Sequence, residues 1–569
     1  MLAKSLRALL ALLLILHLVS LLAHFHASYA SPDASGYFVQ ARILAEHGAL
    51  TFEAESPLQY FGVPWLENDD GSFVSRYPPG LGVVLAATWS TLGATAALLV
   101  NPILATLTLL FVFLAVRRIA GEGAGLLGAV VMAAVPIANR QAMHADSHTL
   151  ATFVVAAATW LLLRWRDRPT TARALLVGAA LGALPCVRYA EGLMLVGAAV
   201  FLWMESGAAG RRRSLISVAA GAAVPLLPLL LVHQSLFGSP FTTAYSLTNE
   251  QTAFAWPALV NHALPYLSSL TTEALGPWLL VGIVGAFSLL AIRDGRSLGL
   301  LVLGGTLPVG AIYLAYYWGA PGDTTNRFFL PLIPLLLVAA FAGLARVDRR
   351  LSGGARRAAR VVVAIAVLAQ ASLFLVAAEE RLVREECGTS RGAATDAWLM
   401  EHATDGDVVI ANRAVQGALE RAGRYRLVDD RLLPGGPRRG IVKTKNPNLR
   451  FMQQGTDGSN PSPHQHDKAD RLRRRYAGVT DVARAKLVLE DLQEWAGGRT
   501  IWWLCEPAEI ERFHALARQG GLFRRVAELD LPTPGSRLLS ALGRERRPYS
   551  RKLPYWFIQP PLVAYRWDP

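Results

Sequence analysis

Cysteine is scarce in this chain, with three residues among 569, so the fold cannot depend on a network of disulfides. Cys186 lies in an apolar run, whereas Cys387 and Cys505 fall in one polar region, where a bridge between them is an open alternative. No glycine-rich dinucleotide fingerprint follows a predicted strand, and the sequence has no Walker-type phosphate loop and no internal repeat. These absences argue against a disulfide-stabilised secreted domain and leave soluble nucleotide chemistry without support.

Charged residues are also few, at 17%, while hydrophobic residues reach 53% and occur in long runs. Such runs indicate a polytopic helical membrane protein rather than a soluble enzyme. Residues 8–29 are long enough to cross roughly 30 Å of hydrocarbon. They lack an evident small-residue cleavage motif, so we expect a retained anchor and not a removed signal peptide.

The net charge of +14 is distributed very unevenly along the chain. Nineteen basic residues fall in one set of loops: Lys4, Arg7, Arg117, Arg118, Arg164, Arg166, Arg168, Arg173, Arg211, Arg212, Arg213, Arg293, Arg296, Arg346, Arg349, Arg350, Arg356, Arg357 and Arg360. Five fall in the opposite loops: Arg42, Arg76, Arg140, Arg188 and Arg327. By the positive-inside rule the first set is cytoplasmic, and the charge therefore predicts orientation in a membrane and no nucleic-acid partner.

This bias and the apolar runs predict eleven transmembrane helices, with the N-terminus in the cytoplasm. They are at about 8–29, 97–116, 121–137, 147–163, 174–188, 191–205, 214–232, 276–292, 298–317, 329–345 and 361–378. Counting residues 77–93 as a further crossing would turn the arginine-rich loops outward. We therefore interpret 77–93 as a helix at the membrane interface.

Two domains are expected. Residues 1–378 form the transmembrane domain, with a long first outer loop at 30–76. Residues 379–569 form a small extracytoplasmic α/β domain, with short buried strands near 407–411, 500–504 and 523–531 and helices near 481–496 and 507–518. The segment 433–475 is rich in Pro, Gly, Asn, Gln and Arg, which is typical of a long mobile loop.

Two carboxylates face the outer compartment at the mouths of predicted spans. Asp33 follows the first span, and Asp146 precedes the span at 147–163. Ionisable groups at such places are functional candidates. Asp33 has an equally weighted alternative, which is to cap a helix over residues 34–46. His144 and His148 are four residues apart and could share a helix face. A divalent metal site formed by His144, His148 and Asp146 is therefore a further alternative, although histidines hydrogen-bonded to other protein groups are commoner.

Basic groups on the same side suit an anionic ligand. Arg327 enters a span from the outer side, against the charge bias, where a guanidinium matches a phosphate well. The alternative is that Arg327 snorkels to the interface. Arg188 and Glu191 lie in another short outer turn, and Tyr245 lies in the loop that follows the span at 214–232.

Several short motifs together resemble a known family. They are Pro32-Asp33 with Tyr37 four residues beyond the acid, Tyr77-Pro78-Pro79-Gly80, Asp146, Phe237-Gly238-Ser239-Pro240-Phe241, and Asn326-Arg327-Phe328-Phe329-Leu330-Pro331. Their order along the chain, and the side of the membrane on which they are expected, resemble those of the polyprenyl-phosphate-dependent membrane glycosyltransferases of the C-type fold. Relatives in that group are the protein O-mannosyltransferases and the aminoarabinose transferase of lipid A. The resemblance covers about residues 1–378.

The resemblance implies that a sugar leaves a polyprenyl-phosphate carrier at the outer face of the membrane, with inversion. Asp33 matches the general base, Asp146 the second acid of the site, and Arg327 a position near the carrier phosphate, where we also place Arg188. For substrate binding we expect Tyr37, Tyr77, His148, Glu191 and Tyr245. Ala34 follows Asp33 where protein O-mannosyltransferases carry a paired Asp-Glu, which weakens a specific prediction of protein mannosylation.

A membrane transporter or flippase is the alternative function, because buried charges and a broken helix near Pro185 also mark substrate pathways. The long first loop and the absence of matching halves disfavour it. The sugar is not encoded in a motif, and the acceptor is a lipid, a glycan or a protein. Composition suggests a bacterial inner membrane, with membrane lipids as further partners and no cofactor other than the metal considered above.

Overall fold

The computed structural model describes most of the chain. The described residues are 2–29, 32–60, 64–68, 70–247, 254–316, 325–411, 423–428, 432–433, 474–476, 478–505, 507–518, 521–529, 531, 534–543 and 562–569. They divide into two compact units: unit 1 comprises Met1–Ala23, Pro78–Leu81 and Leu99–Leu382, and unit 2 comprises His24–Tyr77, Gly82–Leu98 and Val383–Pro569. Each unit is described by itself.

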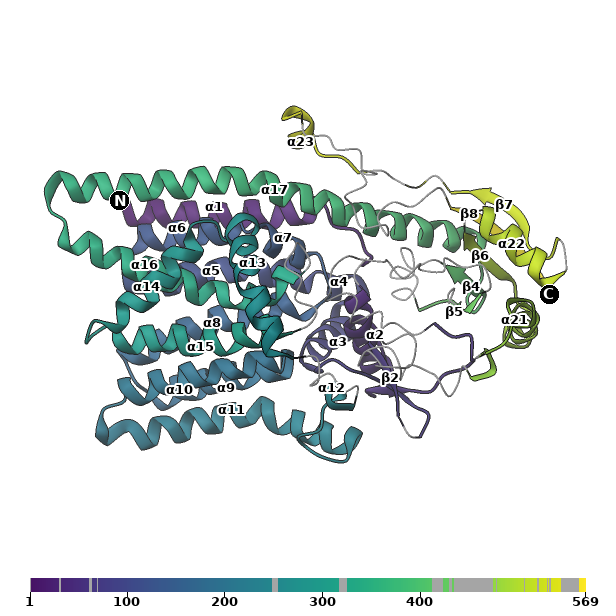
Figure 1. The fold of residues 1–569 in the computed structure, drawn as a ribbon, viewed down its shortest axis with the longest axis horizontal. Helices are drawn as coiled ribbons and strands as arrows, with labels where there is room; N and C mark the ends of the chain where they lie inside the picture. Colours follow the sequence, from purple (N-terminus) through teal and green to yellow (C-terminus); the bar gives the residue numbers. More distant parts are fainter. Residues whose placement is uncertain are drawn as a thin grey trace. The chain divides into compact units, whose positions relative to one another are not determined.

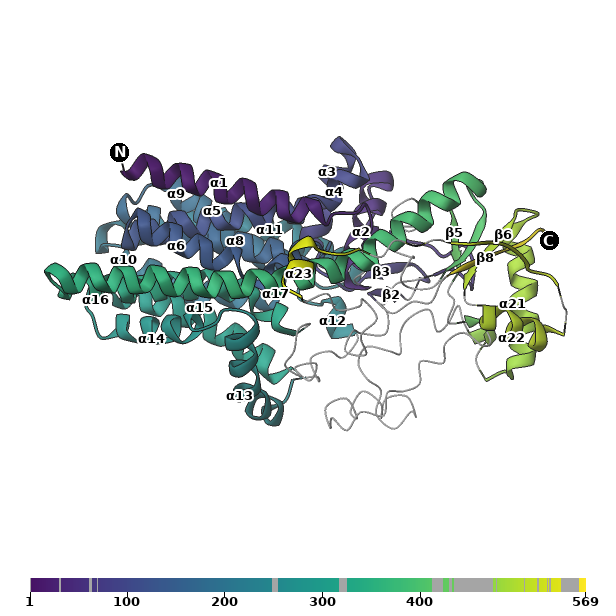
Figure 2. The same cartoon turned by 90° about the horizontal axis from the view of Figure 1, so that it is seen from above.

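Unit 1 is a bundle of helices, most of which run side by side along one direction (Figures 1 and 2). Its helices are α1 (Leu2–Ala23), α5 (Val100–Ala120), α6 (Glu122–Ala133), α7 (Pro136–Ala142), α8 (Ser147–Asp167), α9 (Thr171–Val187), α10 (Met194–Glu205), α11 (Ala208–Phe237), α12 (Ala244–Leu247), α13 (Trp256–Glu273), α14 (Trp278–Leu290), α15 (Arg296–Ala315), α16 (Ile333–Arg350) and the first part of α17 (Gly353–His402). Two 3₁₀ segments, η1 (Ala190–Leu193) and η3 (Thr325–Leu332), precede α10 and α16.

The prediction of a polytopic helical membrane protein is confirmed. Among the described residues, seven helices are long and apolar enough to cross a membrane, or nine if the bent pairs α6–α7 and α13–α14 each count as one span. Each of the eleven predicted spans falls on one of the unit 1 helices. The two predicted spans outside that set of nine correspond to the shorter helices α9, with 17 residues, and α10, with 12 residues.

The span predicted at 121–137 is a broken helix. Pro136 begins α7, and the axis bends by 67° between α6 and α7. A proline has no N–H to continue the helical ladder, so carbonyl groups are released at the break. The amide Nδ2 of Asn139 donates to the carbonyl oxygens of Ala133 at 2.9 Å and Val135 at 3.0 Å. The side chain thereby satisfies backbone groups that would be costly to leave unpaired inside a membrane.

Small residues allow α9 and α11 to approach closely. A Cβ atom at Gly178 or Gly182 of α9 would collide with the carbonyl oxygen of Val218 or Ala222, and one at Gly221 of α11 would collide with that of Leu175. Close backbone contact of this kind is a main source of helix association in membranes, where burial of apolar surface contributes little. The glycines therefore fix the position of α9, at whose C-terminal end Arg188 lies.

Unit 2 contains the first loop. Helix α2 (Pro32–His47) is followed by a small antiparallel sheet in the order β1 (Thr51–Phe52), β3 (Phe73–Ser75) and β2 (Trp65–Glu67). Val39 and Ile43 of α2 pack on Trp65 and Phe73 of the sheet. The helix predicted at 77–93 is present as α3 (Gly80–Leu92), and α4 (Ala94–Leu98) follows it. The interfacial position of α3 stays a prediction.

The C-terminal part of unit 2 carries the predicted small α/β fold. Its sheet has the order β5 (Arg426–Val428), β4 (Val408–Ala411), β6 (Ile501–Cys505), β8 (Val563–Trp567) and β7 (Arg524–Glu528). Strands β5, β4 and β6 are parallel, whereas β8 is antiparallel to β6 and β7. The three predicted strands correspond to β4, β6 and β7, and the two predicted helices are α21 (Asp481–Ala496) and α22 (Pro507–Ala517).

Alternation along the strands separates two cores. Val408 and Ile410 face α21 and α22, while Val409 and Ala411 face Leu399 at the end of α17. No disulfide joins Cys387 and Cys505, and both side chains are buried, so that alternative is wrong. Of the mobile loop predicted at 433–475, residues 434–473 lie outside the described residues.

Candidate functional site

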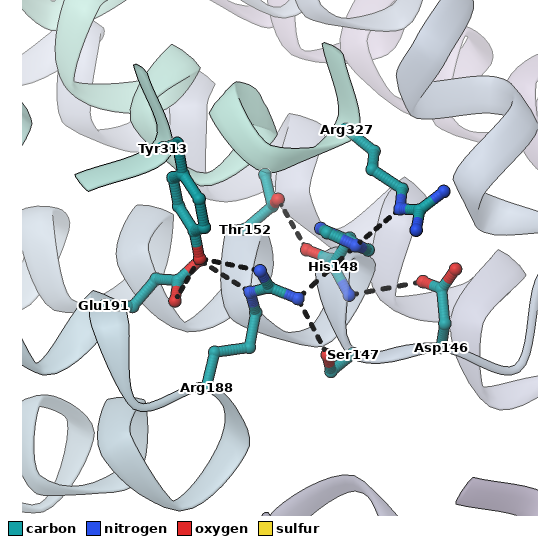
Figure 3. A network of polar contacts seen from close by, with 8 residues as sticks. All are labelled: Asp146, Ser147, His148, Thr152, Arg188, Glu191, Tyr313 and Arg327. Atoms are coloured by element: carbon teal, nitrogen blue, oxygen red, sulfur yellow. Dashed lines mark hydrogen bonds and ion pairs between the residues drawn. The ribbon is translucent and has the colours of Figure 1, made fainter. Parts of the chain in front are cut away.

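Two arginines of unit 1 converge on one histidine ring. Arg327 donates from Nε to His148 Nε2 at 3.1 Å, and Arg188 lies with its Nη1 at 3.3 Å from the same ring nitrogen (Figure 3). Guanidinium nitrogens only donate, so Nε2 is the acceptor and the ring proton lies on Nδ1. His148 is therefore a neutral bridge between two cations, here called the arginine pair.

Arg188 is held by further partners. Its Nε donates to Glu191 Oε1 at 2.7 Å, its Nη2 to the Tyr313 hydroxyl at 2.6 Å, and its Nη1 to Ser147 Oγ at 3.2 Å. The Tyr313 hydroxyl lies 3.0 Å from both carboxylate oxygens of Glu191. Glu191 is fully buried, and burial of a carboxylate is tolerated when it is paired and hydrogen-bonded in this way. The contacts fix the guanidinium plane. His148, Arg188, Glu191, Tyr313 and Arg327 are called the polar cluster below.

Helix ends and 3₁₀ segments position these side chains. His148 lies in the first turn of α8, Arg188 is the C-cap residue of α9, Glu191 belongs to η1, and Arg327 belongs to η3. Aromatic rings line the arginine pair as well: the guanidinium carbon of Arg327 lies 5.1 Å from the centroid of Phe328, and that of Arg188 lies 5.6 Å from the centroid of Tyr313. Cations over aromatic faces gain additional stabilisation.

Asp146 lies beside the polar cluster, at the start of α8. It is the N-cap residue of that helix, and its Oδ1 accepts from the backbone N of His148 at 3.3 Å. Its Oδ2 lies 3.4 Å from His144 Nδ1, and its backbone oxygen accepts from Asn101 Nδ2 at 2.8 Å. These contacts give the Asp146 carboxylate a part in orienting the turn that carries His148. A catalytic role for Asp146 stays a prediction.

Tyr245 lies outside the polar cluster. Its ring packs edge-on against Tyr189, with centroids 5.7 Å apart. The Tyr189 hydroxyl lies 2.9 Å from His233 Nε2, and His233 Nδ1 lies 3.2 Å from the Pro240 carbonyl oxygen. Because the carbonyl only accepts, Nδ1 carries the proton and the tyrosine donates to Nε2. The Phe-Gly-Ser-Pro-Phe loop is thereby tied to the residue that follows Arg188.

Asp33 belongs to unit 2, in a group of its own. It lies in the first turn of α2, which begins at Pro32, so Asp33 is inside the helix and not at the N-cap position that the capping alternative assumed. Its Oδ1 accepts a hydrogen bond from the Tyr77 hydroxyl at 2.8 Å. The Tyr77 ring stacks on Tyr37, with centroids 4.5 Å apart and planes 10° apart. Three of the predicted site residues thus meet.

The metal alternative gains no support from these contacts. Within the parts of the chain that the structure describes, no group of three or more His, Cys, Asp or Glu side chains could hold a metal ion. His148 turns its Nε2 toward two guanidiniums, which would repel a cation at that nitrogen. His144, His148 and Asp146 therefore do not form a joint set of ligands.

Two residues of the site, Tyr313 and Ser147, are not among those predicted from the sequence. Tyr313 lies inside an apolar run, where a tyrosine has no distinguishing pattern, and it meets Glu191 across 122 residues. Ser147 is a small polar residue beside Asp146 at the start of a span, and this position alone gives little reason to predict that it belongs to the site.

The fold and the site define a polytopic membrane protein in which two arginines meet at one buried histidine. Residues 78–233 match the family model described as dolichyl-phosphate-mannose-protein mannosyltransferase. Among solved structures, the chain is similar to ArnT from Cupriavidus metallidurans, bound to undecaprenyl phosphate and in the apo state. Each has 13% identity and a TM-score of 0.56 over 98% of both chains.

The oligosaccharyltransferase of Archaeoglobus fulgidus in the apo form is also similar, with 12% identity and a TM-score of 0.51 over 94% of this chain and 81% of that one. No curated protein sequence matches. At such identities the likeness concerns the fold. The resemblance that the motifs indicated is thereby confirmed at this level: the chain has the C-type fold of membrane glycosyltransferases.

Proposed function

We propose that this chain is an integral membrane glycosyltransferase that moves a sugar from a polyprenyl-phosphate carrier to an acceptor on the outer face of the membrane. The observation that carries the proposal is the arginine pair, in which Arg188 and Arg327 approach one buried imidazole nitrogen. The fold adds a second argument, because one of the similar structures contains undecaprenyl phosphate.

The arginine pair suits the phosphate of the donor. A guanidinium presents a planar set of donors that matches phosphate oxygens, and its charge persists at any physiological pH. His148 keeps the two guanidiniums close together, because both approach its buried Nε2. Glu191 and Tyr313 hold Arg188 in place before the substrate arrives, which reduces the cost of ordering on binding.

For the reaction, the resemblance to the C-type glycosyltransferases supplies the base, Asp33. The acceptor hydroxyl gives its proton to the Asp33 carboxylate while its oxygen forms a bond to the anomeric carbon. The bond from that carbon to the phosphate oxygen breaks, and its electron pair leaves with the polyprenyl phosphate. Arg188 and Arg327 stabilise the negative charge that develops on the phosphate. A single carboxylate base is sufficient, and attack opposite the leaving group inverts the anomeric centre.

The charge bias of the loops supports an arrangement in which the N-terminus is cytoplasmic and unit 2 is extracytoplasmic, in a bacterial inner membrane. Single cysteines introduced at exposed positions, such as Asp405 in unit 2 and Arg293 between α14 and α15, test this topology. A membrane-impermeant maleimide applied from outside should label the first and spare the second. Labelling in the reverse pattern would contradict the proposed orientation.

The decisive experiment is sugar transfer by the purified chain from a panel of radiolabelled polyprenyl-phosphate sugars into a membrane extract. Asp33→Asn keeps the size of the side chain and removes its charge, so we expect transfer to fall by about 10² to 10⁴. Asp70→Asn, in the same loop, is the matched control and should retain activity. Transfer that survives in Asp33→Asn would refute the role of Asp33, and solute flux without transfer would favour the transporter.

A further inference from the structure

Tyr77 touches Asp33 directly and is itself firmly held. Its hydroxyl donates to Asp33 Oδ1 at 2.8 Å, and its ring lies in a stack with Tyr37. The guanidinium carbon of Arg76 is 5.3 Å from the centroid of the Tyr77 ring. Only 8% of Tyr77 is exposed. A phenol O–H lies in the plane of its ring, so the fixed ring holds the hydroxyl where it can donate to the carboxylate.

The backbone on both sides of this contact is also tied together. The N–H of Tyr77 donates to Ser75 Oγ at 3.3 Å, and this hydroxyl donates to the carbonyl oxygen of Gly36 at 3.4 Å. Gly36 has no side chain, and a Cβ at this position would lie 3.0 Å from Cδ2 of Tyr77 and closer still to Pro64. The spacing Asp33, Gly36, Tyr37 on α2 therefore permits the tyrosine to approach the acid.

We infer that Tyr77 is a positioning residue for Asp33, and this inference rests on the proposed function. Its hydrogen bond sets the direction of the carboxylate lone pairs and keeps them aligned for the proton of the acceptor hydroxyl. Tyr77 keeps its own proton throughout: the proton that moves comes from the acceptor and ends on Asp33. Tyr77 does not touch the sugar or the phosphate in this role, so it acts on the rate and not on donor binding.

The test is Tyr77→Phe, which removes the hydroxyl and preserves the ring stack. We expect kcat to fall roughly 10- to 100-fold, the worth of one hydrogen bond to a charged group, with KM for the lipid-linked donor unchanged within about twofold. Tyr425→Phe is the matched control. Tyr425 is also 8% exposed and also belongs to unit 2, and its hydroxyl has no hydrogen-bond partner among the described residues. This control should keep its kcat.

A double variant separates positioning from a general loss of structure. If Tyr77 acts through Asp33, adding Tyr77→Phe to Asp33→Asn should cost nothing further, because the group that it orients is already lost. A purely structural defect would instead add to the loss and lower the melting temperature of the single variant in detergent. The double variant decides the question even if Tyr77→Phe melts earlier.

The possible failures are distinguishable. Full kcat in Tyr77→Phe, a loss confined to KM, or an additive loss in the double variant would each overturn the inference, while the strongly reduced but measurable transfer by Asp33→Asn leaves the proposed function standing. Activity that survives in Asp33→Asn itself would overturn the proposed base, and with it the role of Tyr77.

Discussion

Arg188→Lys is the most informative perturbation of the polar cluster, because it keeps the charge and removes the planar fork. Arg188 uses three nitrogens: Nε for Glu191 at 2.7 Å, Nη2 for Tyr313 at 2.6 Å, and Nη1 for Ser147 and His148 at 3.2 and 3.3 Å. A lysine has a single ammonium nitrogen, which cannot donate hydrogen bonds to all of these partners at once. With Glu191 fully buried beside it, the ammonium is expected to pair with that carboxylate and withdraw from the other partners.

The expected loss of affinity is estimated from the hydrogen bond that the phosphate of the lipid carrier would lose. One hydrogen bond to a charged group contributes about 1.5–3 kcal/mol. Since about 1.4 kcal/mol corresponds to a factor of ten in affinity, Arg188→Lys should weaken binding of undecaprenyl phosphate roughly 10- to 100-fold. Equilibrium titration of the purified chain in detergent micelles with undecaprenyl phosphate measures this directly.

The matched control for this titration is Arg360→Lys. Arg360 is also paired with a carboxylate, with its Nη2 at 2.8 Å from Asp348 Oδ2, but its side chain is 65% exposed and it belongs to no proposed site. Its replacement should leave the affinity unchanged. If Arg188→Lys binds the lipid phosphate as tightly as this control, Arg188 does not contact the phosphate and the assignment of the arginine pair is refuted.

Two further predictions concern the fold. Gly178→Val should lower the melting temperature in detergent, because the side chain would collide with the Val218 carbonyl; Gly210→Val, where nothing lies within 4 Å of the added Cβ, should not. Phe513→Ala removes a fully buried ring from the core beneath α22 and should destabilise unit 2 by roughly 3–5 kcal/mol in denaturant unfolding, against a change within about 0.5 kcal/mol for the half-exposed Val526→Ala.

The sequence predicted the membrane helices well because each is a long apolar run, and a long run leaves few alternatives. Irregular features within the runs were not predicted. The span at 121–137 contains the break before Pro136, and α13 escaped notice altogether. The exposed face of α13 carries Trp256, Val260 and Leu264, whereas its buried face carries His262 and Tyr266. Its mixed composition falls short of a continuous apolar run, although the helix is regular.

The strands that form apolar runs were also predicted from the sequence, and most of the others were not. β4 and β6 are fully buried, so their sequences are short continuous apolar runs, and the length of these runs is typical of strands. β5 has three residues, and the strands of the small sheet after α2 have two or three, too few for any periodicity to be recognised. In β8 only Arg566 is exposed, so the strand has no alternation of buried and exposed residues by which to recognise it. Its place between β6 and β7 is set by long-range pairing, which no local pattern encodes.

The polar cluster shows why part of a site of this kind is accessible from sequence. His148, Arg188, Glu191 and Arg327 all lie at helix ends or in 3₁₀ segments, where an apolar run stops and a charged residue stands out. Tyr313 lies near the end of α15 but still inside its apolar run, and an aromatic residue there is indistinguishable from one that faces lipid.

The physical reason for this placement is common to all four charged or ionisable residues. Helix ends carry backbone groups without partners inside the helix, and in a membrane protein such groups are tolerated where they are enclosed by protein or line a polar space. Side chains that bind an anion need the same environment, so the two requirements coincide at the same ends of the bundle's helices. A polar residue at the boundary of an apolar run is therefore informative about function, whereas its partners within the runs emerge only from the packing.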